Sequence, residues 1–320
     1  MRLCRFEVDG LTLSGFYHED GVFGVEAVAE AFEEATGDDL GLPEPEGLID
    51  DLMPGTARNA ALRRLSGWLA GLDGDEREAL RIDPKAEGVK LLCPLERPRS
   101  LFFLAGNYAA HVVERGGVAA ERAETFPYVF MKPTTTLTHP GDPIVLPAVT
   151  PDHIDWEAEL GVVIGTRCHR VREAEALAYV AGYTVVNDVS DRKFTPNPGR
   201  KPRERDKFFD WLHGKWHDTF CPVGPCLLSA AAVADPQDLP VRLTVNGQVR
   251  QDGTTAQMVF PVAAVVSFLS QFVTLEPGDL ISTGTPSGVG SATGTYLRPG
   301  DVVAATVGGV GRLENPVVAG

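Results

Sequence analysis

The chain has 320 residues, 43% of them hydrophobic and 23% charged, which is enough to bury a substantial core in one large domain with an appendage or in two domains. With 29 Lys and Arg against 44 Asp and Glu, its formal net charge is −15. This balance argues against general affinity for nucleic acid or for an anionic membrane. The five scattered cysteines do not have the spacing of a disulfide framework, a redox pair or a zinc site. With a charged N-terminus that does not resemble a signal peptide, they favour a cytoplasmic protein with reduced thiols.

Residues 1–95 are predicted to form a small N-terminal α+β domain. Asp9-Gly10 is a hairpin signal between two short strands. Apolar residues then recur at helical spacing from Val25 to Phe32, and Thr56 is placed to cap a second helix. No catalytic constellation is recognisable in this part of the sequence.

Residues 96–320 are predicted to form a second domain that is mainly β. Short runs of Val, Ile, Leu and Thr alternate here with turn signals, and helices are expected only near Arg172–Val180 and Pro261–Val273. Proline presets one turn position, and the glycine after it takes the positive φ that the next position requires. The turns carry the same tripeptide at Pro140-Gly141-Asp142, Pro277-Gly278-Asp279 and Pro299-Gly300-Asp301.

One stretch of this second domain, Ile154–Gly165, is predicted to be a β-strand that carries a row of acids. Side chains on a strand point alternately to its two faces, so Asp155, Glu157 and Glu159 share one face. Three carboxylates on one face repel each other, and a divalent cation with oxygen ligands would relieve that repulsion. The alternative is an acidic edge strand that faces solvent. Asp188, where a second apolar strand becomes polar, would complete a metal site, although Asn-Asp is also a common turn signal.

A second constellation pairs His111 with Glu114. Spacing of three residues places both side chains on one side of a helical turn, where the carboxylate can orient the imidazole as a general base. An exposed polar pair is the other interpretation. The turn Gly284-Thr285 can offer backbone N–H groups and a hydroxyl to a developing oxyanion.

Several cations are further candidates for binding an anion. Lys132 and Lys215 each lie beside large apolar residues, so each ammonium either extends to solvent or is fixed on an anion. The basic loop Thr195–Asp206 could recruit an anionic substrate, or it could simply be solvated.

The region from about Leu91 to Val318 resembles the fumarylacetoacetate hydrolase superfamily. The similarity is spread over successive motifs in family order: GNYAAHVVE, FMKP, HPGDPIVLP, IDWEAELGVVIG, YVAGYTVVNDVSDR, GKWHDTFCPVGP, VNGQVRQDG, LEPGDLISTGTP and PGDVV. The combination is far more specific than any single motif. The first ~90 residues look like the variable N-terminal segment of longer members.

This resemblance implies a mixed β-sandwich roll, a Mg²⁺ or Mn²⁺ site and a homodimer. By the family motifs, the metal ligands correspond to Glu157, Glu159 and Asp188, the catalytic residues to the dyad His111 and Glu114 together with Lys215, and the substrate-binding residues to Lys132, Lys215 and Thr285. Gly284, in the same turn as Thr285, is a further candidate for binding substrate. Asp155 is a reserve ligand. The sequence departs from the fumarylacetoacetate hydrolases proper because it has no extra Asp ligand between Gly106 and His111. This argues against fumarylacetoacetate itself as the substrate.

The expected function is that of a metal-dependent hydrolase, as in the acylpyruvases of aromatic catabolism, which cleaves a C–C bond in a 1,3-dioxo acid through a metal-stabilised enolate. The expected partner is a small anionic 2-oxo or 1,3-dioxo acid. The same groups could support decarboxylation of a 2-oxo acid or isomerisation of the 2-hydroxyhepta-2,4-diene-1,7-dioate type. A metal-binding scaffold without turnover is the alternative from another class.

Overall fold

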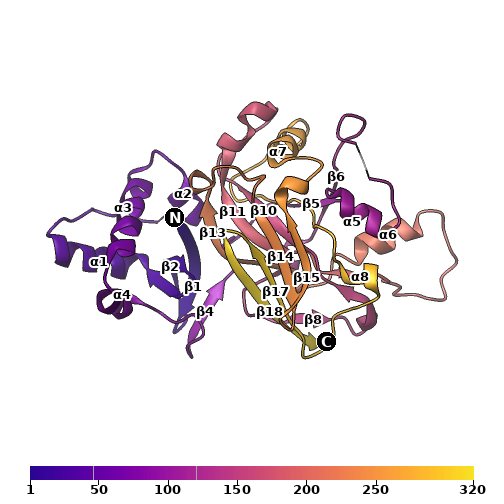
Figure 1. Cartoon of the computed structure of the whole chain (residues 1–320), viewed down its shortest axis with the longest axis horizontal. Coiled ribbons are helices and arrows are strands. Elements are labelled where there is room, and N and C mark those ends of the chain that lie inside the picture. Colours follow the sequence, from indigo (N-terminus) through magenta and orange to yellow (C-terminus); the bar gives the residue numbers. More distant parts are fainter. Residues whose placement is uncertain (46, 120) are drawn as a thin grey trace.

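The computed structural model describes residues 1–45, 47–119 and 121–320. Figure 1 shows the N-terminal helices α1 (Val25–Thr36), α3 (Ala57–Gly71) and α4 (Gly74–Leu80) on one side of a large body of strands, with the short helices α5 (Ala109–Glu114) and α6 (Asp206–His213) on the opposite side. No helix in the described ranges is long and apolar enough to cross a membrane.

Two large sheets dominate the described residues, and both follow from the short β-branched runs in the sequence. The 11-stranded sheet contains β1 (Arg2–Val8), β2 (Leu11–His18), β3 (Gly21–Gly24), β4 (Val89–Leu92), β5 (Leu101–Ala105), β6 (Tyr128–Met131), β7 (Leu137–Thr138), β10 (Ala158–Ile164), β11 (Val180–Asn187), β13 (Cys221–Ser229) and β16 (Leu280–Ser282). The five-stranded sheet contains β8 (Ile144–Leu146), β14 (Pro240–Val245), β15 (Gln248–Thr254), β17 (Val302–Val307) and β18 (Gly311–Ala319). A small ribbon pairs β9 (Ile154–Asp155) with β12 (Ser190–Asp191).

The helices are short and lie outside the sandwich of sheets. They are α1 (Val25–Thr36), α2 (Leu48–Leu52), α3 (Ala57–Gly71), α4 (Gly74–Leu80), α5 (Ala109–Glu114), α6 (Asp206–His213), α7 (Val262–Ser270) and α8 (Gly290–Thr293). The helix predicted near Arg172–Val180 is a 3₁₀ helix over Glu173–Tyr179, and the one predicted over Pro261–Val273 is the shorter α7 with Pro261 as its N-cap.

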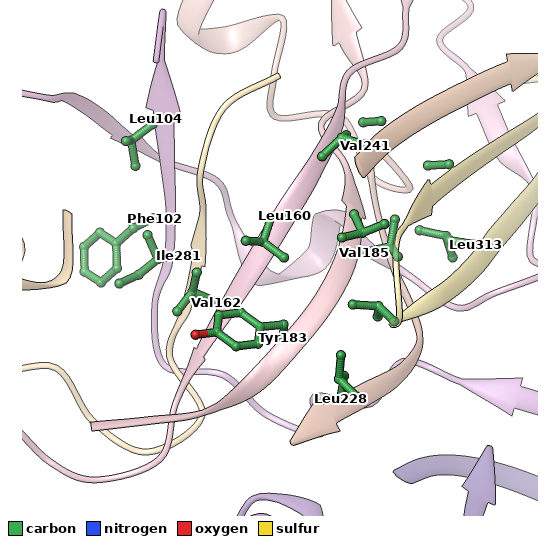
Figure 2. Packing of buried hydrophobic residues seen from close by; sticks show 14 of the residues in the cluster. Phe102, Leu104, Leu160, Val162, Tyr183, Val185, Leu228, Val241, Ile281 and Leu313 are labelled. Atoms are coloured by element: carbon green, nitrogen blue, oxygen red, sulfur yellow. The ribbon is translucent and has the colours of Figure 1, made fainter. Parts of the chain in front are cut away.

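Strand periodicity gives the large sheet two different buried faces. Leu160 and Val162 of β10 face the five-stranded sheet, and Figure 2 shows them packed among side chains from β5, β11, β14 and β18. Val163, one residue further along, belongs to a separate cluster on the opposite face. Because side chains alternate along a strand, Glu159 lies on the same face as Val163, away from the core between the sheets. The architecture is the predicted α+β, mainly β arrangement of mixed sheets.

The predicted turns are confirmed. The Gly residue of each Pro-Gly-Asp tripeptide has a positive φ, at +82° for Gly141, +90° for Gly278 and +93° for Gly300. In each turn the Asp backbone N–H donates to the carbonyl three residues earlier. The Asp9-Gly10 hairpin joins β1 to β2, and the Thr56 hydroxyl accepts the Asn59 backbone N–H at the start of α3.

The N-terminal residues continue the sheet of the main body. β1 pairs with β13 at Arg2 and Leu3, and β4 pairs with the other end of β1. The helices α1 to α3 pack on the face of the sheet that also carries Val163. A division into domains at residues 1–95 and 96–320 stays a prediction.

The side chain of His139 links the segment after β4 to the main body through a hydrogen bond. The backbone N–H of Cys93 donates to Nδ1 of His139 at 2.8 Å, so the bond requires an unprotonated ring nitrogen. Partial burial, with help from the positive charge of Lys90, lowers the pKa of His139 below its usual value. A group whose pKa is lowered on folding contributes stability above its unfolded pKa of about 6.5, and that contribution is lost as the pH falls through its folded pKa.

We therefore predict that replacing His139 with Asn, which keeps an acceptor but cannot titrate near neutral pH, reduces the loss of stability in acid. Thermal unfolding followed between pH 7.5 and 5 should show a smaller fall in Tm for His139→Asn than for the native protein. His169→Asn, at an exposed position, is the control and should match the native slope. Equal slopes for all three proteins would contradict the assigned role.

Candidate metal centre and active site

The three predicted metal ligands meet at one point of the large sheet. In the antiparallel pair β10–β11, Glu159 lies opposite Val186 and the two side chains share a face. Two residues further along the same face are Glu157 and Asp188, and the Asp188 backbone N–H donates to the Glu157 carbonyl at 2.9 Å. One ligand atom from each of the three carboxylates lies within 4.8 Å of the others. All three side chains are buried, so the alternative of an acidic strand facing solvent is wrong.

The predicted single strand Ile154–Gly165 is instead two strands, β9 and β10, with a break at Trp156-Glu157. At this break, side-chain oxygens accept the backbone N–H groups in place of the carbonyl groups of a neighbouring strand. The Glu157 N–H donates to Oδ1 of Asn187, and the Ala158 N–H donates to Oε1 of Gln251. The break directs Asp155 away from the other acids.

Asp155 forms hydrogen bonds with Arg192 and with the first residues of α8. Its carboxylate accepts Nε of Arg192 at 2.8 Å and the backbone N–H groups of Gly290 and Ser291 at 2.6 and 2.9 Å. These contacts use both of its oxygens and disfavour the reserve role as a metal ligand.

Three buried cations surround the carboxylates. Nζ of Lys215 lies 2.8 Å from Glu157 and 2.5 Å from Asp188. Nζ of Lys132 donates to Asp188 at 2.6 Å and also to the Val189 and Phe220 carbonyls. Nη2 of Arg192 lies 2.5 Å from Glu157. Burial opposes the charged form of Glu157, but Arg192 and Lys215 hold its pKa well below the usual range.

Glu159 differs from its neighbours because its hydrogen-bond donors are neutral. Its Oε2 accepts the Ser282 hydroxyl at 2.6 Å and the Gly284 backbone N–H at 2.8 Å. Burial and the negative charges of Asp188 and Glu157 raise its pKa well above the usual range. The cluster therefore lacks positive charge at Glu159. Buried carboxylate oxygens that lack positive charge fit a hard divalent cation such as Mg²⁺ or Mn²⁺.

The predicted His–Glu pair forms and faces the same site. Nδ1 of His111 lies 2.9 Å from Oε1 of Glu114, while Oε2 of Glu114 accepts the Gly288 backbone N–H at 2.8 Å. His111 is buried, so the interpretation as an exposed pair is wrong. Glu114 thus fixes the ring through Nδ1 and leaves Nε2 as the nitrogen that can take a proton.

A shared cavity joins the dyad to the acids. Its lining includes His111, Glu157, Glu159 and Lys215, and its volume is about 40 Å³. A volume of this size holds only a few waters.

The contacts of the predicted substrate-binding residues are mostly directed into the protein. The Thr285 hydroxyl donates to the Ala158 carbonyl at 2.8 Å and accepts Nε2 of Gln251 at 2.7 Å. The Gly284 N–H is used by Glu159, and Lys132 lies behind Asp188 with its ammonium fully buried. These contacts favour positioning roles, and direct substrate binding by these residues stays a prediction.

Sequence reasoning missed Arg115, Arg192, Gln251 and Ser282. Gln251 and Ser282 lie in strands that are remote in sequence from the acidic motif. Pairing of β16 with β10 brings Ser282 to the motif, and Gln251, in the five-stranded sheet, reaches it by accepting the Ala158 N–H. Arg192 follows Asp188 by four residues, and that proximity was the one signal that could have identified it.

The basic loop Thr195–Asp206 forms ion pairs that its sequence alone does not predict. Arg200 pairs with Asp206 and Asp210, and Arg203 pairs with Asp206, at the start of α6. Two of its cations are therefore compensated, which weakens the case for recruitment of an anion by this loop.

We predict that Glu159→Gln abolishes tight binding of Mg²⁺ and Mn²⁺ while the fold survives, since the amide retains the size of the side chain but not its charge. Calorimetric titration should show an affinity loss of about 100-fold or more, beyond the range typical of outer-shell changes. Glu204→Gln, in the exposed basic loop, is the control. Unchanged affinity in Glu159→Gln would remove this residue from the set of ligands.

Lys132→Met should destabilise the metal-free protein. The change leaves Asp188 and two buried carbonyl groups short of a donor, and breaking a buried ion pair costs about 3–5 kcal/mol. Chemical denaturation of this variant should therefore show a much lower free energy of unfolding than Lys201→Met, a change at an exposed position in the basic loop. A cost equal to that of Lys201→Met would mean that Lys132 does not hold Asp188 in place.

Comparison with known proteins agrees with this geometry. Residues 100–318 match the family model described as fumarylacetoacetate (FAA) hydrolase C-terminal. The chain is 46% identical over 200 residues to the 2,4-didehydro-3-deoxy-L-rhamnonate hydrolase of Sphingomonas sp. (strain SKA58), covering 62% of this chain and 65% of that one. It is 35% identical over 320 residues to the mitochondrial oxaloacetate tautomerase FAHD2A of Bos taurus, covering 99% and 92%.

Among solved structures, the maleylpyruvate hydrolase from Sphingobium sp. SYK-6 in complex with manganese(II) ion and pyruvate superposes with a TM-score of 0.70 at 30% identity, over the whole of both chains. The fumarylacetoacetate hydrolase from Exiguobacterium antarcticum gives a TM-score of 0.73 at 29% identity, also over both whole chains. From the family model, the identity to these relatives and the shared fold, we conclude that the chain belongs to the fumarylacetoacetate hydrolase family.

Proposed function

We propose that this protein is a metal-dependent hydrolase that cleaves a C–C bond in a 2,4-dioxo acid of the acylpyruvate type. The observation that carries the proposal is a cavity lined by both His111 and the buried acids Glu157 and Glu159, with Glu114 held on His111 and Asp188 grouped with the two acids. A passive metal scaffold would not require an oriented imidazole beside its acids. The family relatives named as hydrolases support the proposal.

The three carboxylates would hold the divalent ion. When bound, the ion supplies positive charge for the carboxylate and keto oxygens of a 2-oxo acid. The choice between Mg²⁺ and Mn²⁺ stays open, although the maleylpyruvate hydrolase relative was solved with manganese.

The side chains of the dyad would move the protons. Nε2 of His111 takes a proton from water as the water oxygen attacks the distal carbonyl carbon, and Glu114 stabilises the imidazolium that forms. The C–C bond then breaks, the distal fragment leaves as a carboxylic acid, and the electron pair stays on the 2-oxo acid fragment as an enolate. The imidazolium returns its proton to that fragment, so His111 ends the cycle neutral.

Lys215 is placed to exchange partners during this reaction. Burial opposes its charge, but Asp188 and Glu157 raise its pKa, so the ammonium stays protonated in the cavity wall. An ammonium has three hydrogen-bond donors, so this one can transfer hydrogen bonds from the acids to the oxygens of an incoming substrate.

Keto–enol tautomerisation is the second candidate. It is favoured by the oxaloacetate tautomerases that match this chain over nearly its full length, including 99% of it for the protein of Bos taurus. The same imidazole could move a proton between carbon and oxygen of a 2-oxo acid without an attack by water. A homodimeric assembly and a cytoplasmic location stay predictions.

We expect His111→Ala to lower kcat for hydrolysis of 2,4-dioxopentanoate by on the order of 10²–10⁴, the usual contribution of a general base. Glu114→Gln should lower it less, because Glu114 orients the ring and does not take the proton from water. Loss of ultraviolet absorbance of the substrate in the presence of Mg²⁺ provides the assay, and His169→Ala is the control at an exposed position.

Decarboxylation of oxaloacetate by the same variants is the internal comparison. Because decarboxylation needs no attack by water, His111→Ala should retain more of it than of hydrolysis. Equal loss of both reactions would mean that His111 positions the substrate. Hydrolysis near the native rate would remove His111 from the mechanism.

A further inference from the structure

Arg115 stands at the mouth of the cavity, directly after α5. It is the C-cap residue of that helix, four positions after His111, and it lines the cavity together with His111 and Arg192. Arg115 is exposed as a residue, yet the cavity wall covers part of its side chain. Its pKa is lowered by desolvation and by the positive charge of Arg192. Within the described ranges its guanidinium has no hydrogen bond and no ion pair with another side chain.

Arg192, which also lines the cavity, has one hydrogen-bond donor without a partner among the described residues. Its Nε and Nη2 are held by Asp155 and Glu157, whereas Nη1 is buried and has no hydrogen-bond partner among the described residues. The Arg192 side chain is only 5% exposed, so Nη1 cannot be satisfied by bulk water. A buried donor without a partner costs free energy unless a ligand satisfies it.

Other basic side chains near the site differ from Arg115. Lys132 and Lys215 are paired with the acids, and Arg200 is paired with Asp206 and Asp210. Arg122, seven residues after Arg115 in the same segment, is paired with Glu173. Arg115 is therefore an arginine of the cavity wall that no ion pair holds among the described residues, although the carboxylates of Glu157, Asp155 and Glu114 are near enough to stabilise its charge.

The position of Arg115 on the chain couples it to α5. Asn107 anchors the start of this segment through hydrogen bonds to Phe260 and Thr283, and Glu114 anchors its end on Gly288. His111 and Arg115 lie about one helical turn apart and both line the cavity, so a substrate whose reacting carbonyl lies at His111 can extend toward Arg115.

We propose that Arg115, together with Nη1 of Arg192, binds a second carboxylate at the distal end of the substrate, so that the site prefers dicarboxylic 2-oxo or 2,4-dioxo acids over monocarboxylic ones. This inference rests on the proposed function for the identity of the first, metal-proximal carboxylate. Arginine suits this task because its planar guanidinium can hold a carboxylate through two parallel hydrogen bonds. Arg115 thereby becomes a specificity-determining residue.

Binding of non-cleavable ligands tests the inference independently of turnover. Two matched pairs differ only in the distal group: 2-oxoglutarate against 2-oxopentanoate, and 2-oxoadipate against 2-oxohexanoate. Calorimetry in the presence of Mn²⁺ would give their affinities for the native protein and for the variants Arg115→Gln, Arg115→Lys and Arg122→Gln. Arg122→Gln is the matched control because it removes a paired arginine of the same segment.

The native protein should bind the dicarboxylate of at least one pair about 10- to 100-fold more tightly, the range expected for one charge-assisted contact. Arg115→Gln should remove most of that preference without weakening the monocarboxylate, Arg115→Lys should restore part of it, and Arg122→Gln should leave it unchanged. An absent preference in both pairs, or equal weakening of both ligands of a pair by Arg115→Gln, would overturn the inference.

Hydrolysis of 2,4-dioxopentanoate by the same proteins separates the two proposals. If the native protein prefers dicarboxylates through Arg115 but hydrolyses no dioxo acid, the proposed hydrolase function fails and the inference stands. If it hydrolyses dioxo acids and the preference is independent of Arg115, the inference fails and the hydrolase stands.

Discussion

The burial of several carboxylates within a few ångströms of each other is the constraint on which this structure depends. Each would be costly to bury alone, and the chain compensates them with cations that are themselves buried. The acids are Glu157, Glu159 and Asp188, with Asp155 linked to Glu157 through Arg192, and the cations are Lys132, Lys215 and Arg192. For these residues the formal sum is 3 − 4 = −1, and the missing positive charge falls at Glu159, whose hydrogen bonds come from Ser282 and Gly284. Burial and this excess of negative charge raise the pKa of Glu159. A bound divalent cation would lower that pKa.

Side-chain alternation and strand pairing in the large sheet fix the positions of these side chains. Alternation along β10 assigns Leu160 and Val162 to the core between the sheets and leaves Glu159 on the other face. Pairing with β11 brings Asp188 to the same point, and the break before Ala158 turns Asp155 toward Arg192. The turn after β16 holds both halves of the site, since Gly284 binds Glu159 and Gly288 binds Glu114. A Cβ at Gly288 would lie 2.1 Å from the Arg250 carbonyl oxygen, so a glycine is needed for that contact.

The sequence predicted the site best where the chemistry depends on residues only a few positions apart. The acids two residues apart, the His and Glu three residues apart and the Pro-Gly-Asp turns each depend on local geometry, and the structure forms all of them. The continuous strand was a wrong prediction because Asn187 and Gln251, distant in sequence, capture the backbone N–H groups at the break. The ion pairs of Arg200 and the open donor of Arg192 could not be predicted either, because they depend on which remote side chains the tertiary fold brings near. Similarly, the N-terminal strands join the large sheet through β13, a pairing over more than 200 residues that no local pattern specifies.

A crystal structure of the protein grown with Mn²⁺ and a 2-oxo acid would test the central claim most directly, because anomalous scattering locates manganese without reference to activity. The structure predicts one strong anomalous peak coordinated by Glu157, Glu159 and Asp188, with the ligand lying between that peak and His111. A peak elsewhere, or a ligand bound away from His111, would contradict the claim that the buried acids and the dyad form one active site.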